Sequence, residues 1–510
     1  MEEEAAALSM ELSSLLHDLH LQKPRPSPAL PPITELLSRL KEKLIGLPSD
    51  AQSSALIGRV ESLFQTADPH WLFSANGDEG WAELQAAYLG LVNALIGCAA
   101  LPPCEDDCGS LHASAYQSVP SRAQLVCSAL AALLRTLGNA GCPTGLLPAI
   151  AAHVCVFAVT HFQDQAWTSS SSRAAAQSLQ EALLRAGGWR DSSHLLMGGR
   201  EGEEGESRGL LGGILHCLQP QLTKDLWRSE AVKLVFAWTL LQVTRPSLSP
   251  HLSHLLPPSL LLSDHYKPEN CILGVRCLHH IVLNTPPADL RQFNRAEVLY
   301  QALFKHLYST ETQVIQSVLS CLLDLLVVLE KPLSSRGPPS SRRMSGCHDD
   351  VLRLVLTNME AEQKVALRRV YASALPLYID RMGVAVCRHL RQVERVVLGY
   401  LEVRDPPEET SRLKILEVLQ ITTRAAWPRV ACRVDLLLRC LVRLLVAVVS
   451  DCELHVSVRQ QLMDQASLCL QLLDACCHGD VQRLLQQVDS SCCSSEVLRC
   501  LATVTATTER

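Results

Sequence analysis

Apolar residues recur along this chain at steps of three and four, the spacing of one face of an α-helix. From residue 231 onward the pattern predicts helices over residues 231–243, 269–283, 350–359, 361–372, 384–403, 411–427, 429–449, 456–477 and 481–488. Weaker N-terminal candidates cover residues 8–21, 33–47, 55–65 and 81–100. No stretch alternates apolar and polar residues as a half-buried strand does. The chain is therefore predicted to be all-α.

Residues at the predicted helix ends support these assignments. Pro268 stands at the start of one helix, where its missing N–H costs nothing. Asn294 with Glu297, and Thr310 with Gln313, have the spacing of capping boxes and predict the openings of two further helices. Helix pairs joined by short turns are the unit of HEAT-like solenoids, and no strict sequence repeat is visible. We expect a degenerate HEAT-like α-solenoid of stacked helical hairpins.

Breaks in composition indicate how the chain is organised. Acidic, glycine-rich or proline-rich runs occupy residues 102–107 (PPCEDD), 198–206 (GGREGEEGE) and 332–346 (PLSSRGPPSSRRMSG). We therefore expect an N-terminal helical region (1–150), central helical repeats (151–331), a flexible Ser/Arg/Pro-rich linker (332–347) and C-terminal helical repeats (348–510). The linker is either a plain disordered insertion or a site for phosphate, which its serines would accept: Ser334, Ser335, Ser340, Ser341 and Ser345.

Composition favours many similar helix contacts over one large core. Hydrophobic residues make up 47% of the chain but aromatic residues only 4%, so leucine, valine and alanine supply most of the apolar surface. The formal net charge of -6 argues against a surface built for nucleic acid. Charged partners would have to meet a local patch.

Compartment and membrane contact also follow from the sequence. The acidic start (MEEE) is the reverse of a secretory signal, and the strongest candidate membrane span, residues 434–449, contains Asp435, Arg439 and Arg443. The 21 cysteines lie mostly in helical patterns and are expected to be reduced, buried thiols. We expect a cytoplasmic and nuclear protein with no membrane partner.

The motifs of enzyme chemistry are absent or incomplete. The chain has no phosphate-binding loop (GxxxxGK[ST]), no GxGxxG and no GxSxG elbow. Ser411 and Lys414 match the SxxK of acyl enzymes without its companion motifs, and a helix opening is the plainer interpretation. Candidate metal ligands lack suitable partners: Cys104 with Cys108, His279 with His280, His348 with Asp349, Cys476 with Cys477, and Cys492 with Cys493. We expect no catalytic site, no metal, no cofactor and no small-molecule substrate.

Arginines form the one pattern that points to binding. Arg388, Arg391 and Arg395 lie at steps of three and four in one predicted helix. Arg439 and Arg443 repeat this spacing two helices later. If alternate helices form one wall, these stripes stack into a basic strip that would bind acidic protein segments, because the arginine fork pairs with carboxylates at two points. The alternative is an ordinary solvated face, partly neutralised by nearby glutamates.

Two aromatic residues and one more arginine complete the predicted interface. Tyr400, Trp427 and Arg429 are candidate anchors, because tryptophan, tyrosine and arginine dominate the energetics of protein interfaces. Trp427 precedes Pro428 at a predicted helix junction, where a side chain can protrude. Equally, Trp427 would serve to close the core between two helices.

Several blocks resemble the second Tel-Two-interacting protein family. They comprise residues 236–246 (FAWTLLQVTRP), 269–284 (ENCILGVRCLHHIVLN), 294–300 (NRAEVLY), 395–403 (RVVLGYLEV), 412–417 (RLKILE) and 427–430 (WPRV). The blocks occur in the family's order, and the resemblance extends over about residues 153–443. Residues 1–150 and the linker match nothing in it.

The resemblance implies a non-catalytic scaffold, the smallest subunit of the Triple T (TTT) co-chaperone complex. Its partners would be the first Tel-Two-interacting protein and the telomere-maintenance-two protein. Through them it would act with the Hsp-ninety machinery on phosphatidylinositol-kinase-related kinases such as mTOR, ATM and ATR, and so support growth and DNA-damage signalling. A second class of function fits the same fold: a transport receptor of the importin kind, which binds many unrelated cargo segments.

Overall fold

The described part of the chain is entirely helical. The computed structural model describes residues 31–46, 50–74, 77–103, 111–139, 145–199, 209–223, 230–330, 346–485 and 494–505, and no strand occurs among them. The chain divides into two compact units, Met1–Leu262 and Ser263–Arg510. The predicted helix at 8–21 and the linker serines lie outside the described residues. The predicted boundaries at residues 150 and 347 stay predictions.

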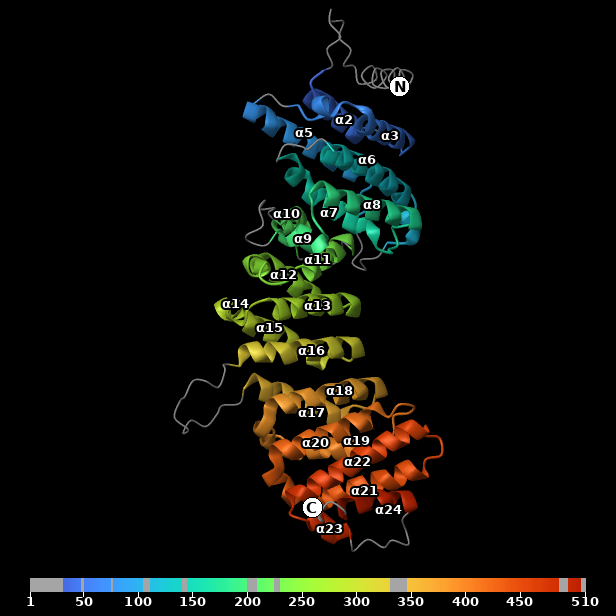
Figure 1. The fold of residues 1–510 in the computed structure, drawn as a ribbon, viewed down its shortest axis with the longest axis vertical. Coiled ribbons are helices and arrows are strands. Elements are labelled where there is room, and N and C mark those ends of the chain that lie inside the picture. Colours follow the sequence, from blue (N-terminus) through green and yellow to red (C-terminus); the bar gives the residue numbers. More distant parts are fainter. Residues whose placement is uncertain are drawn as a thin grey trace, which may run out of the picture. The chain divides into compact units, whose positions relative to one another are not determined.

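The first unit is built from two rows of packed helices (Figure 1). One row contains α2 (Ile33–Gly46), α5 (Gly77–Cys98) and α7 (Leu146–Phe162), and the other contains α3 (Asp50–Thr66), α6 (Val119–Asn139) and α8 (Ser170–Ala186). Helices α10 (Leu211–Leu218) and α11 (Glu230–Gln242) pack against α7. The unit also contains α4 (Pro69–Leu72), α9 (Ser192–Met197) and α12 (Leu252–Ser263).

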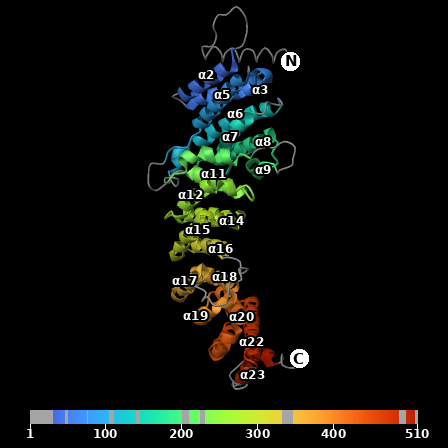
Figure 2. The ribbon, with the colours of Figure 1, turned by 90° about the vertical axis from the view of Figure 1, so that its left-hand side faces the viewer.

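The second unit has the same two-row construction. Helices α13 (Pro268–Asn284), α16 (Thr312–Leu329), α18 (Val365–Met382), α20 (Thr410–Val430) and α22 (Val456–Cys476) each pack on the next. The other row contains α17 (Cys347–Ala361), α19 (Leu390–Glu402) and α21 (Val434–Ser450), and Figure 2 shows α17 and α19 on the opposite side from α18 and α20. The unit also contains α14 (Pro287–Arg291), α15 (Arg295–Phe304), α23 (Asp480–Leu485) and α24 (Ser495–Thr505). The predicted all-α, HEAT-like arrangement of stacked hairpins is confirmed.

Several predicted helix ends are wrong in instructive ways. The helix predicted over 361–372 is α18, which continues through Pro376 to Met382. Proline removes one helical hydrogen bond, but α18 is packed against α16 and α20, and this burial outweighs the loss. At Asn294 the helix begins as predicted, yet the residue is left-handed (φ 56°) and makes no side-chain capping bond. Tertiary packing therefore fixes these ends more than local capping does.

Helix α16 corrects the choice of the most membrane-like segment. By length and composition, α16 is long and apolar enough to cross a membrane. The sequence pattern instead favours residues 434–449 as the strongest candidate span. The residues of α16 from Val314 to Val328 include nine buried ones, and this helix packs against both α13 and α18. A helix that is enclosed by neighbouring helices on both sides inside a protein core has the same apolar composition as a membrane span.

Buried cysteines act as part of the helix packing. Cys127 and Cys277 are fully buried on α6 and α13, and burial raises the pKa of each thiol to about 12. Cys321 on α16 is equally buried, and its pKa is raised in the same way. Such thiols stay protonated at neutral pH and contribute as small apolar side chains.

Gly187 provides a sharp test of packing in the first unit. It ends α8, and a Cβ added there would lie 2.0 Å from Cζ3 of the buried Trp189 ring. Gly187→Ala is expected to lower the free energy of unfolding by about 1–3 kcal/mol, because a packed indole cannot move aside freely. Gly58→Ala, in open space on α3, should instead raise it by up to about 1 kcal/mol. Urea unfolding gives the free energy of unfolding of both variants. Equal changes in the two would contradict the close packing of Trp189 against Gly187.

Candidate partner-binding site

An open groove in the second unit is lined mainly by arginines. Its volume is about 740 Å³. The short helix Gly383–Arg388, the first turns of α19, the end of α20 and the turn Ala431–Arg433 supply its walls. We call it the arginine groove, and define it by five side chains: Arg388, Arg391, Arg395, Arg429 and Arg433.

Three of the five arginines are held by carboxylates of neighbouring elements. The pairs are Arg388 with Asp349 at 2.9 Å, Arg395 with Glu360 at 3.1 Å and Arg433 with Glu394 at 3.4 Å. Asp349 and Glu360 come from α17, and Glu394 comes from α19. These pairs join successive elements of one row, so they fix the arginine side chains and neutralise part of their charge.

The other two arginines carry uncompensated charge. Arg391 and Arg429 are exposed, and neither has a carboxylate within ion-pair distance among the residues that the structure describes. Arg391 lies in the first turn of α19, whose N-cap residue His389 makes no side-chain capping bond. The groove is therefore a local positively charged surface on a chain of net negative charge.

Asp349 organises one wall of the groove. Its Oδ2 accepts hydrogen bonds from Arg388 Nη1 at 2.9 Å and from the Gly346 amide at 3.2 Å, and its Oδ1 lies 2.9 Å from His389 Nε2. Burial alone raises the pKa of this carboxyl, but the contacts with His389, Gly346 and Arg388 outweigh burial and hold the pKa below its ordinary value. His348 points elsewhere, towards Glu330 and the Tyr378 ring.

The lowered pKa of Asp349 makes the stability of this wall pH-dependent. Asp349→Asn is expected to lower the free energy of unfolding by about 1–2 kcal/mol at pH 7. The folded-state pKa lies below the unfolded value of about 3.9, so the stabilisation is complete above that value and is lost as pH falls through the folded pKa. Urea titrations from pH 7 down to about pH 2.5 should show a constant difference from wild type above about pH 4 and a difference that shrinks as the pH falls further. Asp350→Asn is a control with a more exposed carboxylate, and a pH-independent loss at Asp349 would contradict this account.

The structure places the predicted interface residues in three different settings. Arg388, Arg391, Arg395 and Arg429 come together in the groove, and Arg433, which the sequence pattern did not single out, joins them. The only signal for Arg433 was its spacing of four from Arg429. Arg439 and Arg443 are exposed on α21 in the same row but do not line the groove, and Arg443 lies 3.9 Å from Glu402.

Tyr400 is a correction to the predicted interface. Its side chain is 1% exposed and stacks against Arg368, with the guanidinium carbon 3.7 Å from the ring centroid. It lies on the buried face of α19 with Val393, Val396 and Val397, so it belongs to the core of the unit. Trp427 follows a kink at Ala426 and is 53% exposed. Its ring therefore does not close the core between two helices.

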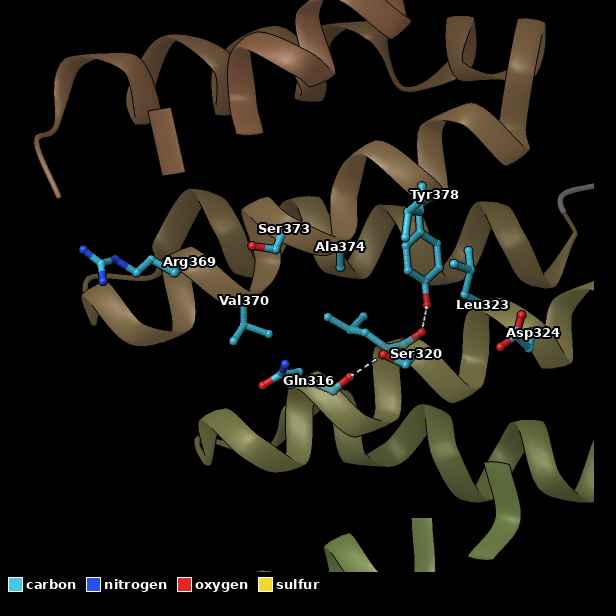
Figure 3. Close-up of a pocket in the computed structure, with 11 residues that line it drawn as sticks. Gln316, Ser320, Leu323, Asp324, Arg369, Val370, Ser373, Ala374 and Tyr378 are labelled. Carbon is cyan, nitrogen blue, oxygen red and sulfur yellow. Dashed lines mark hydrogen bonds between the residues drawn. The ribbon is translucent and has the colours of Figure 1, made fainter. Parts of the chain in front are cut away.

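A second cavity, of about 410 Å³, lies between α16 and α18 (Figure 3). Arg369 and Asp324 stand at its two ends, with Val370 and Ala374 between them. The Tyr378 hydroxyl donates to the Leu319 carbonyl at 2.7 Å. Two further polar side chains of the lining are also engaged: Ser320 donates to the Gln316 carbonyl, and Asp324 pairs with His279 and Arg381. These contacts stabilise helices and do not pair a nucleophile with a base.

The other candidate chemistry is not assembled in the described residues. Ser411 is buried, its amide donates to Asp405, and Lys414 pairs with Glu417 at 2.9 Å, so the SxxK pair does not form. No group of three or more His, Cys, Asp or Glu side chains able to hold a metal ion occurs among the residues described. Cys104, Cys108, Cys492 and Cys493 lie outside them.

Comparison with known proteins places the chain in a family. The Tti2 family model matches residues 217–405. TELO2-interacting protein 2 of Mus musculus is 40% identical over 483 residues, covering 94% of this chain and 93% of that protein. TELO2-interacting protein 2 of Homo sapiens is 46% identical over 362 residues, covering 71% of this chain and 70% of that protein.

Solved structures show only a distant likeness. The karyopherin Kap121p bound to the extreme C-terminus of the protein phosphatase Cdc14p is 14% identical, with a TM-score of 0.43 over 95% of this chain and 51% of that one. An engineered protein is 13% identical, with a TM-score of 0.39 over 94% and 98%. The sequence relatives decide the family: the chain belongs to the Tti2 family.

Proposed function

We propose that this chain is a non-catalytic adaptor subunit of the TTT co-chaperone complex. The observation that carries the proposal is the 40% identity to TELO2-interacting protein 2 along 94% of this chain and 93% of the relative. That relative is named for its interaction with TELO2, the telomere-maintenance-two protein. A match over nearly the whole length of both chains supports a shared partner. The first Tel-Two-interacting protein is the second expected partner.

The physical construction of the chain suits an adaptor. Stacked helices present long rows of side chains on fixed backbones, which is how helical arrays bind other proteins. In the second unit these rows display an arginine groove and a half-exposed tryptophan, Trp427, two residues before Arg429. Arginine and tryptophan are the side chains on which protein interfaces most often depend.

The adaptor has no chemistry of its own in this proposal. The motif search supports it, because the sequence lacks the phosphate-binding and nucleophile motifs of common enzymes. Acting with its two partners and the Hsp-ninety machinery, the chain would promote assembly and stability of phosphatidylinositol-kinase-related kinases such as mTOR, ATM and ATR. It would do so in the cytoplasm and the nucleus.

Affinity purification of the tagged full-length chain from its own cells tests the proposal. At moderate salt, mass spectrometry should recover TELO2 and the first Tel-Two-interacting protein in stoichiometric amounts, with kinases and chaperones at lower levels. Depleting the chain should lower kinase abundance without changing kinase transcripts. Recovery of scattered cargo proteins without either subunit would overturn the proposal and favour the transport-receptor class.

A further inference from the structure

We propose that the arginine groove binds an acidic segment of a partner protein, whose carboxylates reach Arg391 and Arg429. The inference deepens the proposed adaptor function and rests on it for the protein nature of the occupant. The groove is defined by the five arginines that line it. Its two uncompensated members make it a receptor for negative charge.

The balance of charge within the groove supports this occupant. Five guanidinium groups meet three carboxylates of the same chain, those of Asp349, Glu360 and Glu394. Two positive charges remain on Arg391 and Arg429, while the whole chain carries a formal charge of -6. An acidic segment is therefore repelled by the chain as a whole and attracted to this groove, which gives the contact its specificity.

The existing ion pairs indicate carboxylates as the matching groups. Along this row, carboxylates of one helix pair with arginines of the next at distances of 2.9 to 3.4 Å. Arg391 and Arg429 are the two groove arginines at which this alternation stops. Aspartate or glutamate side chains of a partner would continue it, and the planar arginine fork can pair with a carboxylate at two points.

The shape of the groove favours a short extended segment. It is open to solvent, and the first turns of α19 and the end of α20 form two of its walls. Arg391 and Arg429 come from these two different helices, so a ligand must bridge them to satisfy both. A peptide with spaced carboxylates can pair with both guanidinium groups at once.

A direct measurement uses the purified full chain and a fluorescent peptide that alternates Asp and Glu with Gly and Ser. Anisotropy should show salt-dependent binding of this peptide and none of its Asn/Gln counterpart. R391E/R429E should weaken binding at least about 30-fold, and R391Q/R429Q about tenfold, because each charged hydrogen bond is lost. R439E is the matched control, since Arg439 is exposed on α21 outside the groove, and it should stay within about twofold of wild type.

Three results of the peptide measurement would contradict the proposal that the arginine groove binds an acidic segment. They are equal binding of the acidic and neutral peptides, wild-type affinity of R391E/R429E, and a loss in R439E as large as that in the groove variant. A doubly phosphorylated peptide that binds about tenfold more tightly than the acidic one would replace the carboxylate assignment with phosphate. Circular dichroism and urea unfolding confirm that each variant is folded.

Co-purification then separates the groove from the adaptor function. If the wild-type chain recovers TELO2 and the first Tel-Two-interacting protein but R391E/R429E does not, both proposals are supported. If both chains recover the partners equally, the adaptor function stands and the groove inference fails. If the wild-type chain recovers neither partner, the adaptor proposal fails, and the peptide measurement alone decides the groove.

Discussion

Replacing Asp405 with alanine is expected to lower the free energy of unfolding by about 2–4 kcal/mol. Asp405 lies in the loop between α19 and α20, and its side chain is 3% exposed. Its Oδ2 accepts a hydrogen bond from the Ser411 amide at 2.9 Å and pairs with Arg369 Nε at 3.2 Å. Removing the carboxylate leaves a buried amide at the start of α20 without its acceptor.

The Asp405 carboxylate also joins α18 to α20, which are successive helices of one row. Arg369 belongs to α18, and its Nη2 also donates to the Asp405 carbonyl at 2.6 Å. Glu409, four residues on, is left-handed (φ 51°), so the loop backbone is held in a conformation that it would not adopt unaided. The loss at Asp405 therefore combines a broken ion pair, an unpaired amide and a loosened loop.

Glu408→Ala is the matched control for Asp405→Ala. Glu408 pairs with the same arginine, Arg369, at the same distance of 3.2 Å, but its side chain is 62% exposed. An exposed pair contributes little, so this variant should stay within about 1 kcal/mol of wild type. Urea unfolding at neutral pH compares the two, and similar losses from both would contradict the role of burial at Asp405.

The sequence predicts the existence of helices better than their ends. The helix predicted over 269–283 appears as Pro268–Asn284, because a proline and a clear apolar face mark it. The helix predicted over 384–403 divides into a short helix ending at Arg388 and α19 from Leu390. A junction of this kind depends on contacts between Asp349 and His389, forty residues apart, and no local pattern reports such contacts.

The sequence indicates which arginines share a face of one helix, but not which arginines of different helices lie together in the folded chain. Arg391 and Arg395 have a spacing of four, which places them on one face of α19. Arg429 and Arg433 follow the kink at Ala426 and line the same groove as the arginines of α19, which no local spacing reports. Tyr400 was assigned to the surface because of its residue type, although its spacing from Val393 and Val397 puts it on the buried face. Residue type suggested an interface at Tyr400, and helical position overrules it.

Trp167 and Trp427 give the largest expected contrast between two identical residues. Trp167→Ala should lower the free energy of unfolding by about 3–5 kcal/mol. Trp167 is 2% exposed, its Nε1 donates to the Thr160 carbonyl at 3.0 Å, and its ring lies 5.8 Å from that of Tyr116. Alanine would remove this hydrogen bond and ring contact and leave a cavity beside Tyr116, Val119 and Ala231.

Trp427→Ala should change stability by less than about 1 kcal/mol, because 53% of its surface is already exposed to water. If Trp427 is an interface anchor, the same variant should still reduce recovery of protein partners in co-purification. Urea unfolding separates stability from binding in both variants. A large stability loss at Trp427 would return this residue to the core, and a small loss at Trp167 would contradict the packing of the first unit.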